Sequence, residues 1–256
     1  MNTLSNKNEH TDYHLYTDDP EAQEKNGSAI SGYDKLNVSI RLGFIRKVYA
    51  ILTVQLLIST FMCLLSMYSE SFFKFQMQNF WFLIISMVVT LILPCLGLCF
   101  IDLFRKVPSN FIFLFTFTFF ESYIISWICG MTNPRLVFMA AVMTFGMVAG
   151  LTVYAATTKR DLTLEGGSIF ILGMTVFLLA IFAMFTSNPI VHVLISSFWV
   201  FIFGIYLVYD TQLILGNGEL KLTVDDYIWA SFMLYLDIIN IFINLLQILR
   251  IISNDR

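Results

Sequence analysis

The chain has 256 residues, of which 57% are hydrophobic and 13% are charged, and its mean hydropathy is +0.75. Soluble domains carry about 25% charged residues, so this composition excludes an ordinary soluble enzyme and predicts an integral membrane protein. The net charge of −3, without a basic run to collect phosphates, argues against nucleic acid as a partner.

Residues 1–40 form a polar, acidic segment without helical periodicity. Such a segment does not bury enough apolar surface to offset the entropy lost on ordering, and we expect a disordered tail on the cytosolic side. The first apolar run starts near Val48, too far along the chain for a cleaved signal peptide. We therefore expect the first membrane helix to act as the targeting signal.

Residues 41–256 form the predicted membrane domain, in which seven apolar runs alternate with short polar breaks. Each run has close to the ~20 residues that a helix needs to cross a bilayer. Continuously apolar runs do not fit the alternating strands of a membrane barrel. We predict an all-α, polytopic membrane protein with a seven-helix bundle. The predicted helices cover residues 48–67, 80–101, 111–130, 136–156, 168–186, 193–215 and 228–249.

Lysine and arginine residues near the helix ends indicate the orientation, because cytosolic loops carry an excess of them. With seven spans, nine lie on the side of the N-terminus and four on the other, which predicts a cytosolic N-terminus. A re-entrant last segment, which would leave both termini in the cytosol, stays open. The nine are Lys35, Arg41, Arg46, Lys47, Arg105, Lys106, Lys159, Arg160 and Lys221, and the four are Lys74, Arg135, Arg250 and Arg256.

Three acids fall inside predicted spans, namely Glu121, Asp210 and Asp237. A charge at the bilayer centre costs about 2.5–3.5 kcal/mol on insertion scales, so such residues usually line a cavity or meet a partner. From the cytosolic ends of their helices, Asp210 lies about 7–8 Å deep and Asp237 about 13–14 Å deep. One helical turn separates these depths, and the two carboxyl groups are therefore expected to meet.

Two neighbouring carboxyl groups at low dielectric do not both ionise readily and tend to share a proton. The pair is therefore predicted to act as a proton-sensitive clasp between the last two helices. In the alternative interpretation, each acid only hydrogen-bonds a tyrosine or an asparagine and fixes helix packing. The same alternative applies to Glu121.

The last helix carries a polar stripe on an otherwise apolar surface, at steps of three, four and three residues. A helix of this kind is expected in the middle of the bundle, with the stripe facing other helices or water. The preceding helix adds Tyr206, one turn before Asp210. The stripe consists of Asp237, Asn240, Asn244 and Gln247.

Known catalytic signatures, such as H-E-x-x-H or G-x-S-x-G, are absent from the sequence, and we predict neither an enzyme nor a cofactor. Intramembrane aspartyl proteases remain a less favoured alternative, since Tyr209-Asp210 fits the first half of their motif. Asp237, however, follows Leu234-Tyr235-Leu236 where that class has Gly-x-Gly.

Several motifs together resemble the transmembrane Bax-inhibitor-motif family, in its Lifeguard branch. They are Tyr-Asp-Thr-Gln-Leu at 209–213, Leu-Tyr-Leu-Asp-Ile-Ile-Asn-Ile-Phe at 234–242, Gly-Leu-Thr-Val-Tyr at 150–154 and Ile-Arg-Lys-Val-Tyr at 45–49. The likeness covers residues 42–252.

This resemblance implies a bundle with the last helix central, a calcium leak from Golgi or endoplasmic reticulum stores, and suppression of apoptosis. It also implies that Asp210 and Asp237 form the pH-responsive pair that gates the path. Bacterial relatives have an arginine in the second helix that can engage this pair, whereas residues 80–101 contain no basic residue.

We therefore expect a passive leak in which the lipid bilayer and calcium ions are the partners. Asp210 and Asp237 would form a weak calcium site, because two carboxyl groups offer fewer oxygens than the six to eight of a tight site. A non-conducting regulator that binds Bcl-2-type apoptosis regulators or calcium-release receptors is the second hypothesis. Further candidates for the ion path are Glu121, Tyr206, Asn240, Asn244 and Gln247.

Overall fold

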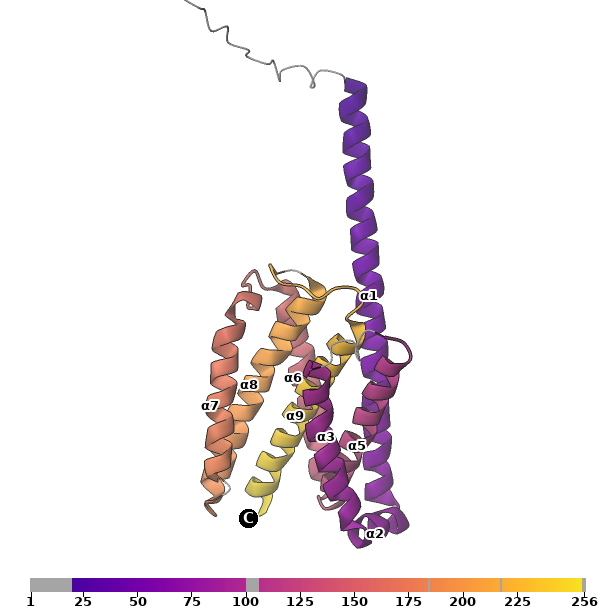
Figure 1. The fold of residues 1–256 in the computed structure, drawn as a ribbon. Helices are drawn as coiled ribbons and strands as arrows, with labels where there is room; N and C mark the ends of the chain where they lie inside the picture. Colours follow the sequence, from indigo (N-terminus) through magenta and orange to yellow (C-terminus); the bar gives the residue numbers. More distant parts are fainter. Residues whose placement is uncertain (1–19, 100–105, 184, 217, 255–256) are drawn as a thin grey trace, which may run out of the picture. The chain divides into compact units, whose positions relative to one another are not determined.

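The computed structural model describes residues 20–99, 106–183, 185–216 and 218–254 (Figure 1). The chain divides into two units, residues 1–42 and residues 43–256. In the first unit the described backbone is helical from Pro20, whereas the composition predicts no structure up to residue 40. The sequence accommodates this helix because its proline stands at the first helical position, where no N–H partner is needed. The prediction for residues 1–19 falls outside the described residues.

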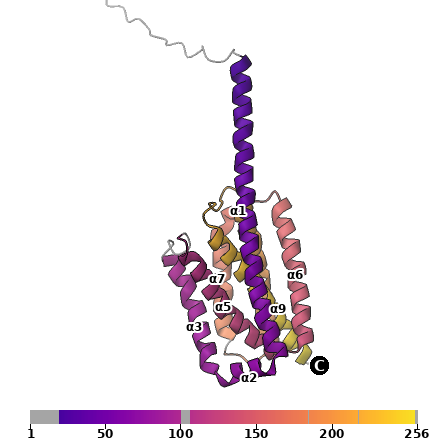
Figure 2. The same ribbon diagram turned by 90° about the vertical axis from the view of Figure 1, so that its right-hand side faces the viewer.

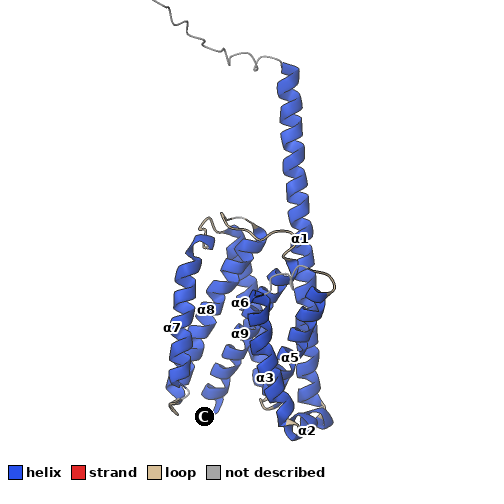
Figure 3. Ribbon diagram, viewed as in Figure 1, coloured by secondary structure: helices blue, strands red, loops and turns tan. Residues whose placement is uncertain are grey.

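All regular structure in the described residues is helical (Figure 3), which confirms the all-α prediction. Within the described ranges, seven helices are long and apolar enough to cross a membrane, and each corresponds to one predicted span. The chain is therefore a multi-pass membrane protein. The elements are α1 (Pro20–Tyr68), α2 (Glu70–Gln78), α3 (Phe80–Cys99), α5 (Ser109–Gly130), α6 (Pro134–Thr157), the 3₁₀ turn η1 (Thr163–Glu165), α7 (Gly166–Ala183), α8 (Pro189–Leu215) and α9 (Tyr227–Asn254).

Asparagine–proline pairs start two of the spanning helices earlier than their apolar runs suggest. The Asn133 side chain accepts a hydrogen bond from the Arg135 N–H at 2.9 Å, and Asn188 accepts one from Ile190 at 3.0 Å. These caps satisfy backbone donors that would otherwise lack partners. Helix α8 ends at Leu215 and is capped by Gly216, whose φ of 69° favours glycine. The chain turns back at this glycine toward α9.

Helix α2 is a short element that the hydropathy pattern does not reveal. It has nine residues, too few to cross a bilayer. Its buried Gln76 accepts a hydrogen bond from Ser66 of α1 at 2.6 Å and donates one to Ser126 of α5 at 2.9 Å. The helix is thereby fixed to the ends of two spanning helices.

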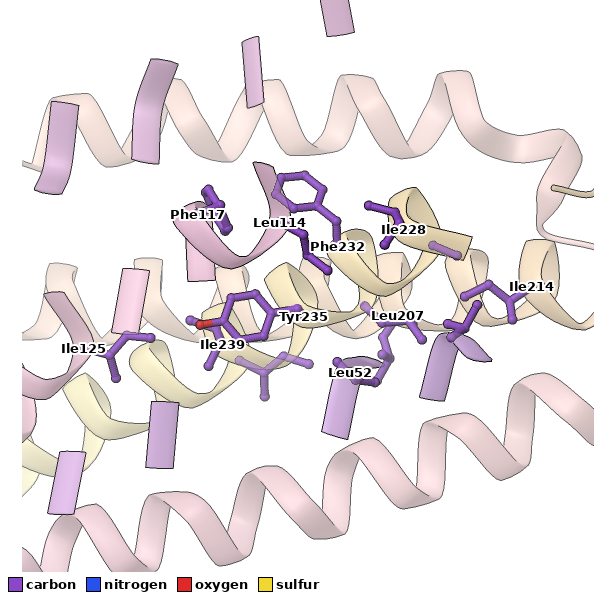
Figure 4. Packing of buried hydrophobic residues seen from close by; sticks show 14 of the residues in the cluster. Leu52, Leu114, Phe117, Ile125, Leu207, Ile214, Ile228, Phe232, Tyr235 and Ile239 are labelled. Carbon is purple, nitrogen blue, oxygen red and sulfur yellow. The ribbon is translucent and has the colours of Figure 1, made fainter. Parts of the chain in front are cut away.

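Helix α9 lies among the other helices of the second unit (Figures 1 and 2) and packs against α5, α6 and α8. Figure 4 shows its buried side chains Phe232, Tyr235 and Ile239 within the hydrophobic core, beside Phe117 of α5 and Leu207 of α8. Spans α5 and α9 are the most buried of the seven. The last helix is therefore central, as predicted.

Candidate functional site

Helices α8 and α9 bring two acids together inside the bundle. Asp210 is 6% exposed and Asp237 is 4% exposed. Their carboxyl groups lie within hydrogen-bonding reach of each other, at the interface between the two helices. The sequence places these residues one helical turn apart in depth, and the packing of α8 on α9 brings their side chains together.

The surroundings of the two acids do not compensate two negative charges. Neither acid has a lysine or arginine ion-pair partner among the described residues. The buried Oδ2 atom of Asp237 has no hydrogen-bond donor there. A buried charge without a partner costs several kcal/mol, on the order of 3–5 for a broken buried pair. One proton held between the carboxyl groups removes one charge and supplies the donor that is lacking.

Helix α7 packs against the tyrosines of α8 through glycines. The Tyr206 hydroxyl donates a long hydrogen bond of 3.5 Å to the carbonyl of Ile169. A Cβ atom at Gly173 would lie 2.9 Å from that hydroxyl, and one at Gly166 would lie 3.0 Å from the Tyr209 hydroxyl. Tyr206 is also close enough to both acids to interact with them electrostatically. Tyr206 is thus a path candidate that lies near both acids.

The amides of the polar stripe bind their own helix. Asn240 donates to the carbonyl of Leu236 at 2.8 Å, and Asn244 donates to the carbonyl of Asn240 at 2.8 Å. Gln247 lines a separate cavity of about 380 Å³ with His192 and other residues near the end of α9. The amide hydrogen bonds of Asn240 and Asn244 thus stay within α9.

Glu121 belongs to a different helix from either acid of the pair. It is half-buried on α5 and makes no hydrogen bond or ion pair with Asp210 or Asp237 in the described part of the chain. It lies instead on the side of the bundle where Tyr235 faces α5. No cluster of three or more His, Cys, Asp or Glu side chains forms among the described residues. Among the described residues, the pair therefore offers a cation two carboxyl groups without a third acid, histidine or cysteine in the same cluster.

A buried hydroxyl cluster joins α1, α5 and α9 and was not predicted from the sequence. The Ser59 hydroxyl lies 2.8 Å from both the Ser122 and the Tyr235 hydroxyls. One turn away, the Gln55 amide donates to Thr118 at 2.9 Å. The sequence signal for this cluster is a pair of polar residues at i and i+4 on each of two helices. It is weak, because isolated serines and threonines are scattered through the apolar runs.

Gln212 fastens the loop between α6 and α7 to the end of α8. Its side-chain amide donates to the carbonyl of Arg160 at 2.8 Å, and its carbonyl oxygen accepts from the Leu162 N–H at 2.9 Å. The side chain is buried and lies two residues beyond Asp210. The loop is therefore held directly against the turn of α8 that carries the acid.

Asp161 ties the same loop to the one between α8 and α9. Its carboxylate accepts hydrogen bonds from the Thr163 N–H at 2.9 Å, the Thr163 hydroxyl at 2.6 Å and the Glu219 N–H at 2.8 Å. These donors, those of Thr163 first, lower the pKa of Asp161 below its ordinary value. A Cβ atom at Gly218 would lie 2.5 Å from the carboxylate, so a side chain at this position would displace Asp161. We call these contacts of Gln212 and Asp161 the loop clamp.

These features define a class: a polytopic helical membrane protein built around a buried carboxyl pair between its last two spans. Residues 41–255 match the family described as Bax1-I, "Inhibitor of apoptosis-promoting Bax1", and the chain belongs to this family.

Three relatives support the assignment, each 32% identical. Bax inhibitor 1 of Schizosaccharomyces pombe aligns over 218 residues, 85% of this chain and 79% of its own length. Protein lifeguard 4 of Mus musculus aligns over 85% of this chain and 88% of its own length. The Golgi anti-apoptotic protein of vaccinia virus (strain Lister) aligns over 86% and 90%. The resemblance drawn from the motifs is thus confirmed.

Proposed function

We propose that this protein is a pH-sensitive calcium leak channel of intracellular membranes that lowers store calcium and suppresses apoptosis. One observation supports this most strongly: two buried carboxyl groups lie side by side between α8 and α9 without an ion-pair partner among the described residues. Intramembrane acids of this kind usually belong to ion pathways or proton relays.

In the closed state one proton is shared between Asp210 and Asp237, and the hydrogen bond holds α8 against α9. When both groups are ionised, two negative charges ~4 Å apart repel by about 4 kcal/mol at an effective dielectric constant of ~20. This repulsion loosens the helix interface and leaves two carboxylates to attract a cation. The leak therefore increases as pH rises through the range in which the pair loses its proton.

Calcium is the proposed ion because it prefers oxygen ligands. Two carboxyl groups offer four oxygens, fewer than the six to eight of tight calcium sites, and such a weak site lets an ion leave as well as enter. Tyr206 is the further candidate for the path beside the pair. Glu121 would act at a distance, through its negative potential.

The Golgi or the endoplasmic reticulum is the proposed location, with a cytosolic N-terminus. The name of the viral relative, a Golgi anti-apoptotic protein, supports both the location and the effect on apoptosis. The charge bias between the two membrane sides supports the orientation.

Reconstituted vesicles test the proposal. Liposomes that contain only this protein should release calcium faster at higher pH, and the variant D210N/D237N should lose that pH dependence. Glu70→Gln is the matched control, because Glu70 is an exposed acid paired with Lys74 on α2, away from the pair. An unchanged pH response in the double variant would refute gating by the pair.

The second candidate function is a regulator without conduction, and the family's description as an inhibitor of apoptosis-promoting Bax1 favours it. Its partners would be Bcl-2-type apoptosis regulators or calcium-release receptors. Vesicles with the pure chain separate the two functions, since a regulator alone produces no calcium flux at any pH.

A further inference from the structure

A long groove runs between α1, α6 and α9, on another side of α9 from the acid pair. It encloses about 470 Å³ and is lined almost entirely by apolar side chains. Its buried wall includes Ile125, Val137 and Ile239, and the hydroxyl of Ser59 belongs to the same wall. None of the residues proposed for the ion path lines this groove.

The groove has the depth of one membrane leaflet. On α6 its lining extends from Pro134 to Val148, about 21 Å at 1.5 Å per residue. One leaflet with its headgroup region is about 20–22 Å thick, half of the whole bilayer. Tyr68 at the end of α1 and Pro134 at the start of α6 both lie at the non-cytosolic surface in the proposed orientation. The groove therefore runs from that surface to the middle of the membrane.

The position and lining of the groove indicate its occupant. The groove lies along three membrane-spanning helices, is lined almost entirely by apolar side chains and has the length of one leaflet. These properties match an extended hydrocarbon chain of the surrounding bilayer. Phe138 and Phe145 line the groove with 70% and 76% of their surfaces exposed, and they can close over such a chain.

We propose that this groove binds one acyl chain of a membrane phospholipid from the non-cytosolic leaflet. The acyl chain can enter the groove without passing through water, because the groove lies within the membrane-spanning part of the protein. Tyr68 stands at the mouth, where a tyrosine side chain suits the headgroup region.

The bound chain also contacts the helix that carries the acid pair. Ile238 and Ile239 of α9 line the groove and directly follow Asp237. Ser59 in the groove wall is hydrogen-bonded to Tyr235, two residues before that acid. An occupied groove supports α9 from the side opposite α8, so lipid binding and the packing of the acid pair are coupled.

Photo-crosslinking of the purified full chain tests the proposal. The protein is reconstituted in phosphatidylcholine vesicles that contain a phospholipid with a diazirine on its acyl chain, and labelled peptides are identified by mass spectrometry. Labelling should concentrate on residues 56–68, 134–148 and 238–242. Even labelling of all lipid-facing helices would overturn the proposal, as would protein–protein crosslinks between two copies at the groove.

Variants that fill the groove sharpen the test. Ala141→Trp fills it from α6 and Thr60→Trp from α1, and each should lower labelling at least fivefold. Val142→Trp is the matched control, because Val142 is exposed on α6 outside the groove. Helical content measured by circular dichroism verifies that each variant is folded. Undiminished labelling in both folded filling variants would overturn the proposal, and this readout does not depend on calcium conduction.

Discussion

Asp237 has a carboxyl oxygen without a donor among the described residues, beside a second acid that offers a donor only when it is protonated. Because of this pairing, Asp237→Asn and Asp237→Leu should affect the protein differently. Asparagine supplies a permanent N–H donor to Asp210, so the two helices should stay joined at all pH values. Leucine leaves Asp210 buried without its partner.

We expect Asp237→Asn to give a low calcium leak that does not respond to pH, with stability equal to or above that of the wild type. Asp237→Leu should lower the free energy of unfolding by about 1–3 kcal/mol, the cost of a buried polar group left without a partner. Flux from liposomes and thermal unfolding in detergent measure the two effects. A strongly pH-dependent leak in Asp237→Asn would contradict this account of the pair.

The hydroxyl cluster offers a second test at the scale of single residues. Ser59→Ala removes the hydroxyl that contacts both Ser122 and Tyr235, and it should destabilise the protein by about 0.6–1.7 kcal/mol. Ser197→Ala is the matched control, because the exposed Ser197 hydroxyl donates to the carbonyl of Val193 in its own helix and has no other hydrogen bond among the described residues. Equal unfolding temperatures for the two variants would show that the cluster contributes nothing.

Between elements, the loop clamp holds the two loops at the end of α8 beside Asp210. Gln212→Met keeps the size of the side chain but loses both hydrogen bonds to the loop between α6 and α7. Residues 158–166 should then exchange amide hydrogen at least tenfold faster, and the basal leak should rise. Arg160→Ala is the control, because it removes only an exposed ion pair with Glu165. Unchanged exchange in Gln212→Met would show that the loop is held by other contacts.

The loop clamp should not itself sense mildly acidic pH. Donors from Thr163 and Glu219 favour the ionised form of Asp161 and lower its pKa. Its contribution is present above the pKa of the unfolded chain, about 3.9, and is lost only as pH falls through the lowered value. Exchange of residues 158–166, corrected for intrinsic rates, should be constant from about pH 8 to about pH 5. Loss of protection in that range would assign a pH response to the clamp.

Hydropathy predicted the elements better than it predicted their ends. The seven spans follow from runs of apolar residues, because the membrane demands that length. Asn133 and Asn188 start their helices earlier than the runs do, since capping depends on hydrogen bonds rather than on hydropathy. Helix α2 is too short and too polar for that signal.

For the candidate site, the sequence predicted the acid pair but not the contacts around it. Asp210 and Asp237 stand out because charge inside a span is rare. The contacts of Gln212 depend on how two loops fold back onto α8, and no helical period encodes that geometry. Asn240 and Asn244 fit a polar stripe by spacing, yet their amides bind the backbone of α9.

For the whole molecule, the proposed gating depends on the orientation in the membrane, because the orientation decides which side of the membrane lies nearer to the acid pair. Asn26-Gly27-Ser28 is a glycosylation acceptor, and a cytosolic N-terminus predicts that it stays bare. An acceptor tag added after Arg256 should carry sugar if α9 crosses the membrane, and should stay bare if the last segment re-enters. Mobility shifts upon deglycosylation read out both sites. Sugar on Asn26 would invert the proposed topology.

The central claim is that calcium passes when the acid pair gives up a shared proton. Infrared difference spectroscopy of the reconstituted protein follows the protonated carboxyl band while calcium efflux is recorded over the same pH series. The band should disappear over the pH interval in which efflux rises, and both changes should be absent in D210N/D237N. Efflux that rises while the carboxyl band persists would contradict the claim.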